Sequence, residues 1–568
     1  MDVETSRADV LIIGGGGAGL RAAIEADEAG VSVALVNKGL ISRSGLTPMA
    51  GSSFQAAFGH SDPRDGVQVH FDDTVQEGRF LGDENLIQAL VREAMDRAED
   101  LERYGVRFIK EKGRFIQVRH AGQTYPRINQ IAGRGHQMTV ALRNELSRRG
   151  GIQIFEDCPV FRILTSSDGR PAGAVGFRQR EAHLHVFQCK AVILATGGYE
   201  ELWEKTDTAP DSTGDGIALA FPLGAELVDL EMMLYYPIAT LGSRVFPSMR
   251  HALAYETLLG EEYLGGKLLN NREEEFLPQG SLPARDLLTR LIVKEQLEGR
   301  ATDRGGVYVN LSRSPLSPQD LENRIEALGA RAQVNRLKYL GLDLAKDPVE
   351  VAPACHYGLG GIRINEYAET SIPGLFAAGE VSGNLHGANR ISGNALAETQ
   401  VFGRIAGQRA SREAKGVKAF PAPRRKEEKD DIERLKKLFA KKNDPLRPAG
   451  LRKKIKKIME EEVGLNRSDQ SLREAIACLQ AIEEEDLPRL QVARTGIFNC
   501  ELQDAIEVGF MAQVARLVAT AALLRTESRG HHFRSDFPEE SEAWLRHTII
   551  WKCGRQVACQ SAPVIRLK

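Results

Sequence analysis

Apolar runs and polar segments alternate in a regular order along the first forty residues. Val10 to Ile13 are four consecutive apolar residues, typical of a strand that is buried on both faces. A glycine-rich stretch follows and leads into Arg21 to Ala29, a segment of good helix formers. The apolar residues between Val31 and Val36 then predict a second strand. This order predicts a βαβ unit with two parallel strands.

The glycines between the first strand and the helix have the spacing Gly14-x-Gly16-x-x-Gly19. Such a turn lets the backbone approach a pyrophosphate, whose charge is stabilised at the N-terminus of the helix. The motif therefore predicts a dinucleotide site. Asn37 and Lys38 end the second strand, where an NAD site usually carries an acid for the ribose 2′-hydroxyl. The missing acid favours FAD over NAD.

Further along the chain, periodicity predicts helices near 85–103 and 135–149 and strands near 153–155, 175–177 and 191–195. Prolines interrupt a loop-rich segment between about 227 and 344, and glycine-rich turns return after it. Beyond about 416 the sequence is rich in Lys, Glu and Leu, with a helical period.

We therefore expect a multi-domain α/β (α+β) fold, in which a second domain is inserted into the dinucleotide-binding domain. The expected parts are a Rossmann-like domain over 1–228 and 345–412, a capping domain over 229–344, a helical domain over 416–528 and a C-terminal region over 529–568.

Composition excludes several classes of function. With 42% hydrophobic and 27% charged residues and a net charge of −2, the chain is an ordinary globular protein and not a general nucleic-acid binder. A locally basic stretch between Arg424 and Lys457 is interpreted as solvated helix surface. The seven cysteines have no C-x-x-C pair and no iron–sulfur or zinc spacing, so no metal centre is expected. No leader and no membrane-spanning run is expected, which predicts a cytoplasmic protein, peripheral to a membrane through partners at most.

Several spaced blocks carry a family resemblance: Gly14 to Gly19, Ser42-Arg43-Ser44, Ala195 to Gly198, Thr213 to Gly216, His356-Tyr357-x-x-Gly360-Gly361, Gly379-Glu380 and His386 to Arg390. In this joint order they resemble the flavoprotein subunit of succinate dehydrogenase and fumarate reductase, a family that also includes L-aspartate oxidase. The similarity spans essentially the whole chain. The family's fold is an FAD-binding domain with an inserted capping domain, then a helical domain and a C-terminal region.

The resemblance implies FAD as the cofactor and a set of residues that contact it. They are Gly14, Gly16, Gly17, Ala18, Gly19, Asn37, Lys38, Ser44, Thr196, Gly197, Asp215, Glu380, Arg390, Asn394 and Leu396. One departure concerns how the flavin is attached. Where respiratory members carry a histidine bonded covalently to the flavin, this chain has Gly45 after Ser44. We therefore expect non-covalent FAD, with a bias toward substrate reduction or toward aspartate-oxidase chemistry.

Catalysis in the family is hydride exchange between flavin N5 and one carbon of a carbon–carbon double bond, with proton exchange at the neighbouring carbon. By resemblance, His356 and Arg390 bind one substrate carboxylate and Arg285 transfers the proton. An arginine is almost always protonated, so it can transfer a proton only if a relay reloads it.

The other end of the expected substrate site departs from the family. Tyr236 replaces a histidine that binds the second carboxylate. The relay threonine, glutamate and arginine align with Leu258, Leu259 and Glu262, unless the alignment shifts by a few residues and Glu256 serves as the relay. A buried second carboxylate without a partner would cost several kcal/mol. The sequence therefore leaves two options open, a substrate with one carboxylate and a C4 dicarboxylate that Tyr236 helps to bind.

The sequence predicts an FAD-dependent enzyme that interconverts a saturated carboxylate and its α,β-unsaturated counterpart, as succinate and fumarate are interconverted. Because the chain has no cluster ligands of its own, we expect a small carboxylate substrate and an iron–sulfur partner subunit. L-aspartate oxidase is one alternative. An electron-transfer flavoprotein without its own substrate is another.

Overall fold

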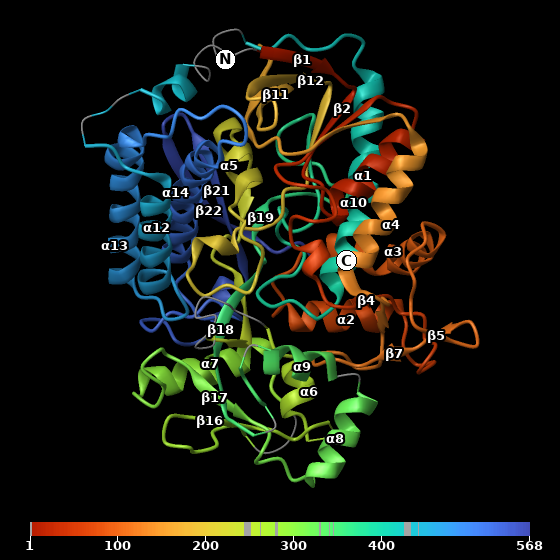
Figure 1. Ribbon diagram of the computed structural model, residues 1–568. Coiled ribbons are helices and arrows are strands. Elements are labelled where there is room, and N and C mark those ends of the chain that lie inside the picture. Colours follow the sequence, from red (N-terminus) through yellow and green to blue (C-terminus); the bar gives the residue numbers. More distant parts are fainter. Residues whose placement is uncertain are drawn as a thin grey trace.

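The computed structural model describes residues 3–242, 252–261, 263–278, 282–328, 331–339, 341–344, 346–424, 433–440, 442 and 444–567. Its centre is a parallel sheet of five strands in the order β20-β13-β2-β3-β9 (Figure 1). The strands are β20 (Leu375–Ala377), β13 (Ala191–Leu194), β2 (Val10–Ile13), β3 (Val33–Val36) and β9 (Ile152–Phe155). The residues of β2, β3 and β13 are all buried, as expected for strands covered on both faces.

Helices from distant parts of the chain pack around α1 (Gly17–Glu28), the helix that follows β2 (Figure 1). The long helix α10 (Asn394–Gly416) lies against it, and Gly403 and Gly407 make the close approach possible. A Cβ atom at either glycine would come within 2.6 Å of the carbonyl oxygen of Ala18 or Ala22. The other helices here are α2 (Val67–Glu77), α3 (Glu84–Arg103) and α4 (Arg134–Arg149).

A second sheet has the order β1-β12-β11-β10 and lies at the top of Figure 1. Its strands are β1 (Val3–Arg7), β12 (His183–Gln188), β11 (Pro171–Arg178) and β10 (Val160–Thr165). Strand β1 is an edge strand that pairs in parallel with β12, and its side chains are largely exposed. Smaller strands lie near α2 and α3: β4 (Ser53–Gln55), β8 (Ile128–Gln130), β7 (Gln117–Val118), β5 (Lys110–Glu111) and β6 (Arg114–Phe115).

The capping domain has its own sheet and its own apolar core, and it forms the lower part of Figure 1. The sheet has the order β15-β18-β17-β16, and two long strands, β15 and β18, connect it to the rest of the molecule. Its elements are β15 (Met233–Thr240), α6 (Tyr255–Leu259), β16 (Lys267–Leu269), α7 (Arg285–Leu297), β17 (Val307–Asn310), α8 (Pro318–Ala327), α9 (Arg331–Tyr339) and β18 (Val349–Gly358).

Three helices near the C-terminal end pack side by side: α12 (Pro448–Glu462), α13 (Asp469–Ala481) and α14 (Cys500–Leu524) (Figure 1). By length and composition alone, α14 could cross a membrane, a candidate that the sequence analysis did not expect. Most of the apolar stretch is buried against α12, α13 and α5 (Asp215–Ala220). Such burial is typical of a core helix, because its apolar side chains are covered by other parts of the protein.

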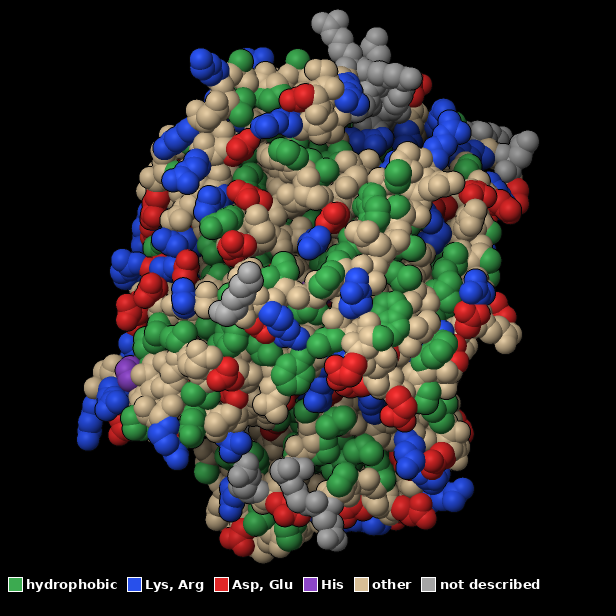
Figure 2. All heavy atoms as spheres, turned by 180° about the vertical axis from the view of Figure 1, so that it is seen from behind, with side chains coloured by type: hydrophobic (Ala, Val, Ile, Leu, Met, Phe, Trp, Pro, Cys, Tyr) green, Lys and Arg blue, Asp and Glu red, His purple; other side chains and the backbone are tan. Residues whose placement is uncertain are grey.

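The C-terminal hairpin pairs with strands from earlier segments of the chain. Its strands β21 (Arg546–Cys553) and β22 (Gln556–Pro563) extend a sheet that contains β14 (Leu227–Val228) and β19 (Gly361–Ile362). Buried Arg525, at the end of α14, pairs with Asp229, Glu231 and Glu527. It also donates to the carbonyl oxygens of Trp544 and Arg546, so three segments meet at one cation. On the face drawn in Figure 2, basic and acidic side chains are interspersed over most of the surface.

Candidate active site

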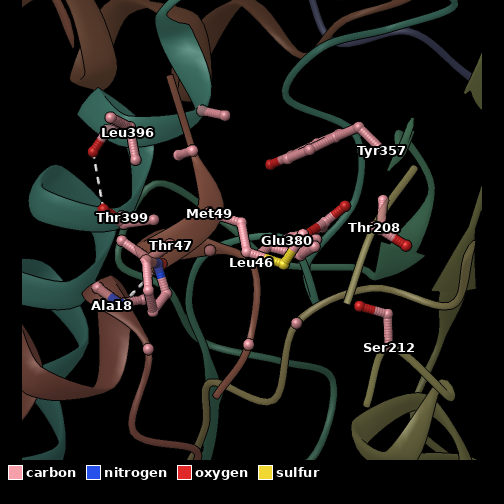
Figure 3. A pocket seen from close by; sticks show the side chains of 18 of the residues that line it. Ala18, Leu46, Thr47, Met49, Thr208, Ser212, Tyr357, Glu380, Leu396 and Thr399 are labelled. Carbon is pink, nitrogen blue, oxygen red and sulfur yellow. Dashed lines mark hydrogen bonds between the residues drawn. The ribbon is translucent and has the colours of Figure 1, made fainter. Parts of the chain in front are cut away.

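The loops at the carboxyl ends of the central strands surround one cavity of about 860 Å³. Gly14 to Ala18 follow β2, Asn37 and Lys38 follow β3, Thr196 and Gly197 follow β13, and Glu380 follows β20. Parallel strands place these loops at one edge of the sheet, which is where ligands of such folds bind. Figure 3 shows Leu396 and Thr399 of α10 on one side of this cavity and Tyr357, Thr208 and Ser212 on the other.

Two glycines explain why the binding loop has its form. Gly14 has φ +109°, and a Cβ atom there would lie 2.1 Å from the carbonyl oxygen of Ala195. A Cβ atom at Gly19 would lie 1.8 Å from the carbonyl oxygen of Gly14, so Gly19 lets α1 pack onto the strand. The Asn37 side-chain oxygen accepts from the Gly15 N–H and Thr47 accepts from the Gly17 N–H, which fixes the loop.

Lys38 lies at the end of β3, where an NAD site usually carries an acidic residue. Its ammonium group forms ion pairs with two carboxylates of this chain. Its ammonium lies 3.0 Å from Asp215 and 3.1 Å from Glu507 of α14. Burial alone would lower the pKa of Lys38, but these carboxylates raise it above its usual value, so the side chain is charged. Lys38 thereby fixes the start of α5 and links the cofactor-side loop to the helical domain.

Glu380 lies beside a second buried carboxyl group, that of Glu200. Both accept a hydrogen bond from the Gly358 N–H, at 3.0 and 2.8 Å. Burial and the charge of Glu200 raise the pKa of Glu380 well above its usual range, so this carboxyl group holds a proton. A protonated carboxyl group can both donate and accept hydrogen bonds toward a ligand hydroxyl.

Most of the expected cofactor-contacting residues line the cavity, and three lie behind its surface. These three are Gly19, Ser44 and Asn394. The Ser44 hydroxyl accepts a hydrogen bond from the Asn37 side chain at 3.0 Å and so positions a lining residue. Asn394 is fully buried at the start of α10, bonded to His70 and Thr74. Asn394 is next in sequence to Gly393 and Ala395, which do line the cavity.

His356 and Arg390 lie at the end of the cavity next to the capping domain. Nδ1 of His356 lies 3.0 Å from both carboxylate oxygens of Asp207, which fixes the ring and leaves Nε2 for the cavity. Arg390 lies over the ring of Tyr357, with its guanidinium carbon 4.5 Å from the ring centre. Burial and the charge of Arg285 lower the pKa of Arg390 to about 10, which still leaves it cationic at neutral pH. Its buried Nε has no hydrogen-bond partner in the described part of the chain.

Arg285 begins α7 of the capping domain and reaches the same cavity. Its Nη2 lies 3.8 Å from Oε1 of Glu256, and its guanidinium carbon lies 5.2 Å from the centre of the Tyr236 ring. Burial opposes the charge of Arg285, but Glu256 and two tyrosines raise its pKa above the usual value. A protonated arginine next to a carboxylate is the arrangement that a proton relay requires.

The structure bears on the two alignments considered for the relay. Leu258 and Leu259 are buried in the apolar core of the capping domain, whereas Glu256 and Thr257 line the cavity. Glu262 lies outside the described residues. Tyr236 also lines the cavity, with its ring centre 5.1 Å from that of His356, and burial and Glu256 raise the pKa of its phenol. Tyr236 is therefore a neutral group that can donate one hydrogen bond.

Sequence reasoning missed His120, which lines the cavity together with Ser392. Its Nδ1 lies 3.0 Å from the Ser392 hydroxyl, and its ring is close enough to Glu256 and Arg285 for their charges to act on its pKa. Burial lowers that pKa, so the ring is neutral at neutral pH. No motif marked His120, because it lies in an irregular loop after β7 that only the fold brings to the cavity.

Comparison with known proteins identifies the family. Residues 9–396 match the family described as FAD binding domain, and residues 452–566 match the one described as fumarate reductase flavoprotein C-term. A fumarate reductase (CoM/CoB) subunit from Methanothermobacter marburgensis is 39% identical over 559 residues, which are 97% of this chain and 98% of that relative. This chain belongs to the flavoprotein subunits of the fumarate reductase and succinate dehydrogenase family.

Solved structures agree with the sequence comparison. Mycobacterium smegmatis Sdh1 matches with a TM-score of 0.89 and 31% identity, over 99% of this chain and 95% of that one. The FrdA chain of the E. coli quinol fumarate reductase matches with a TM-score of 0.88 and 29% identity, over 99% and 98%. The predicted fold class and the predicted family are both confirmed.

FAD is the cofactor of this family, and the cavity fits it. The binding loop and the small residues that line the cavity provide a surface for a ligand with phosphate and ribose groups. The buried hydroxyl of Thr196 adds to it, since it has no hydrogen-bond partner among the residues that the structure describes. At Gly197, φ is +81° and a Cβ atom would meet nothing within 4 Å, so its face is open to a ligand. The protein is thus an FAD-dependent oxidoreductase of the succinate and fumarate type, acting on CH–CH groups.

Proposed function

We propose that this chain reduces a fumarate-type C4 dicarboxylate and receives its electrons from an iron–sulfur partner subunit. The observation that carries the proposal is the meeting of Arg285, Arg390 and His356 in the cavity next to the cofactor loops. The CoM/CoB fumarate reductase relative is named as one subunit of its enzyme, which supports both the reaction and the existence of a partner. Gly45 in place of the histidine used for covalent attachment supports non-covalent FAD.

In the proposed mechanism, Arg390 and His356 bind one carboxylate of the substrate. The charge of Arg390 withdraws electron density from the conjugated double bond, which prepares the far carbon for hydride attack. When bound, FAD supplies the hydride at its N5 atom. Arg285 holds the proton for the neighbouring carbon, and Glu256, 3.8 Å away, returns a proton to it.

The second carboxylate is bound by neutral donors in this proposal. Tyr236 donates from its phenol and His120 donates from Nε2, with Nδ1 of His120 held by Ser392. Hydrogen bonds to an ionised carboxylate contribute about 1.5–3 kcal/mol each, enough to offset part of its burial. An acid with one carboxylate, the other option left open by the sequence, would not use these donors.

The test begins with purification of the chain together with whatever co-elutes. Acid precipitation should release all of the flavin into the supernatant, whereas flavin retained in the pellet would show a covalent link. With a reduced dye as the electron source, fumarate should be reduced faster than the one-carboxylate acid crotonate by at least tenfold in kcat/KM. Faster turnover of crotonate would overturn the dicarboxylate assignment.

The same preparation separates the alternatives. Peroxide formation from aspartate and oxygen would identify an L-aspartate oxidase. If the reduced flavin were reoxidised only by a protein partner and by no carboxylate, the chain would be an electron-transfer flavoprotein. Rapid reoxidation by fumarate supports the proposal against both.

A further inference from the structure

Far from the cavity, two histidines and a glutamate point their ligand atoms at one another on the sheet of β1 and β12. His183 and His185 are two residues apart on β12, so their side chains lie on the same face. Glu4 of β1 is paired directly with His185 in the strand register. The three ligand atoms all lie within 4.8 Å of one another.

We propose that Glu4, His183 and His185 bind a divalent transition-metal ion such as Zn²⁺, with one coordination position left to water. Imidazole nitrogens together with one carboxylate are a common ligand set for zinc, and three protein ligands leave the fourth tetrahedral position open. The mechanism proposed above does not use these residues.

The distances suit an ion. Oε2 of Glu4 lies 3.2 Å from Nε2 of His183 and 3.8 Å from Nδ1 of His185. Ligand atoms around a tetrahedral zinc with bonds of about 2.0–2.1 Å are separated by about 3.3 Å. The three side chains therefore need only small movements to coordinate an ion at their centre.

The two imidazole nitrogens that face Glu4 are buried, and neither has a hydrogen-bond partner among the described residues. His185 is 3% exposed and His183 is 9% exposed. Buried polar atoms are nearly always satisfied, so two orphaned nitrogens beside one carboxylate indicate a missing ligand. An ion between them would satisfy both at once.

A further hydrogen bond sets the state of His185. Its other nitrogen, Nε2, lies 2.8 Å from the hydroxyl of Ser6, on the same face of β1 as Glu4. When Nε2 donates to Ser6, Nδ1 carries the lone pair toward Glu4, as metal-binding histidines require. The rings of Phe187 and Phe155 pack against His185 with centres 4.4 and 5.0 Å away, so the ring is already oriented.

The surrounding charges do not exclude a cation. Arg178 is paired with His183 across the strands of β11 and β12, but its guanidinium is bound to Glu181 at 2.8 Å. Glu4 is 63% exposed at its side chain, so an ion can enter from solvent. A bound ion would tie the exposed edge strand β1 to β12, just before the chain enters β2 and the FAD-binding loop.

The experiment uses the flavin-loaded protein after treatment with a chelator. Titration with Zn²⁺ in a calorimeter should show one equivalent, and the melting temperature should rise when that equivalent is present. Glu4→Gln and His183→Gln, each made separately, should weaken this binding by at least about tenfold. Asp168→Asn is the matched control, because Asp168 lies in the turn between β10 and β11 of the same sheet and its side chain is as exposed as that of Glu4.

The result can also overturn the proposal. If the wild type takes up no equivalent, or if Glu4→Gln and His183→Gln bind zinc as the wild type does, the group is an ordinary ion pair of histidine and glutamate. An equal loss in Asp168→Asn would place any ion elsewhere on the sheet and overturn the ligand set.

Discussion

Arg285 and Glu256 come from different helices of the capping domain, and their side chains approach to 3.8 Å at the edge of the cavity. Glu256 lies in α6 and Arg285 begins α7, so the pair exists only when the capping domain is folded. His356 lies near the end of β18, and Arg390 lies in the loop before α10 of the FAD-binding domain. The proposed reaction therefore depends on how the two domains meet, a relationship that no local motif encodes.

Arg285→Lys should lower turnover by at least about 100-fold while the flavin content stays normal. Lysine keeps the charge, but its single ammonium cannot occupy the same place beside Glu256 and over the Tyr236 ring. The measurement is kcat for fumarate, together with the flavin absorbance per protein. Unchanged turnover would show that Arg285 is not the proton donor.

Glu256→Gln tests the proposed role of Glu256 in reloading Arg285. The amide cannot carry a proton to the guanidinium, so we expect kcat to fall roughly tenfold or more with little change in KM, and a larger solvent isotope effect. Glu261→Gln is the control. Glu261 is exposed and lies just after the same helix, and its substitution removes an equal charge. If both variants behave alike, the effect is one of general electrostatics and not of a relay.

His120→Phe tests the far end of the substrate site. The ring keeps its volume but loses the donor, so KM for fumarate should rise by roughly 10-fold to 100-fold, the equivalent of one hydrogen bond to a carboxylate. Crotonate, which has no second carboxylate, should be affected much less. An equal loss for both substrates would assign His120 a packing role beside Ser392.

Much of the fold near the N-terminus follows from local signals. The prediction of helices over 85–103 and 135–149 differs by one residue at the start from α3 and α4, because the periodicity was clear. Strands β1 and β12 were not predicted. Their sequences, rich in charged and histidine residues, resemble surface segments, and only pairing between residues 3–7 and 183–188 makes them a sheet.

The candidate site also contains residues that the sequence predicts and residues that it does not. Residues in motifs, such as Arg285, His356 and Arg390, could be assigned from the family blocks, and all three line the cavity. His120 and Asp207 could not, since each acts through a partner far away in sequence: Ser392 in one case and His356 in the other. The relay was ambiguous because glutamates lie on both sides of Leu258. Glu256 of α6 lies 3.8 Å from Arg285, whereas Glu262 lies outside the described residues.

Buried histidines predict how stability changes with pH. Burial and the charge of Arg127 lower the pKa of His70 from 6.5 to about 3 in the folded protein. Below pH 6.5 the unfolded chain therefore binds a proton that the folded protein does not bind. The contribution of His70 is fully present above pH 6.5 and is lost between 6.5 and about 3, by about 1.4 kcal/mol per pH unit.

Melting of the holoenzyme at pH 7.5 and 5.5 checks this sign, and His70→Gln should show a smaller decrease between the two values than the wild type. His136→Gln serves as the control, since His136 is exposed. A decrease in His70→Gln equal to that of the wild type would show that His70 is not one of the groups responsible.

Arg525→Met tests the cation that joins the three segments. Arg525 is fully buried and bonds to Glu231 at 2.6 Å, to Glu527 at 3.0 Å and to Asp229 at 3.3 Å. Methionine fills a similar volume but leaves the buried carboxylate of Glu231 without its cation and weakens the pairing of Asp229 and Glu527, which keep His547 and Arg529. This should cost about 3–5 kcal/mol of unfolding free energy. The matched control is Arg473→Met, because Arg473 forms an exposed pair with Asp469, where at most about 1 kcal/mol is expected. Denaturant unfolding, followed by flavin release, measures the unfolding free energy of both variants. An equally small loss of unfolding free energy in the two would mean that the buried carboxylates take up protons and do not need the cation.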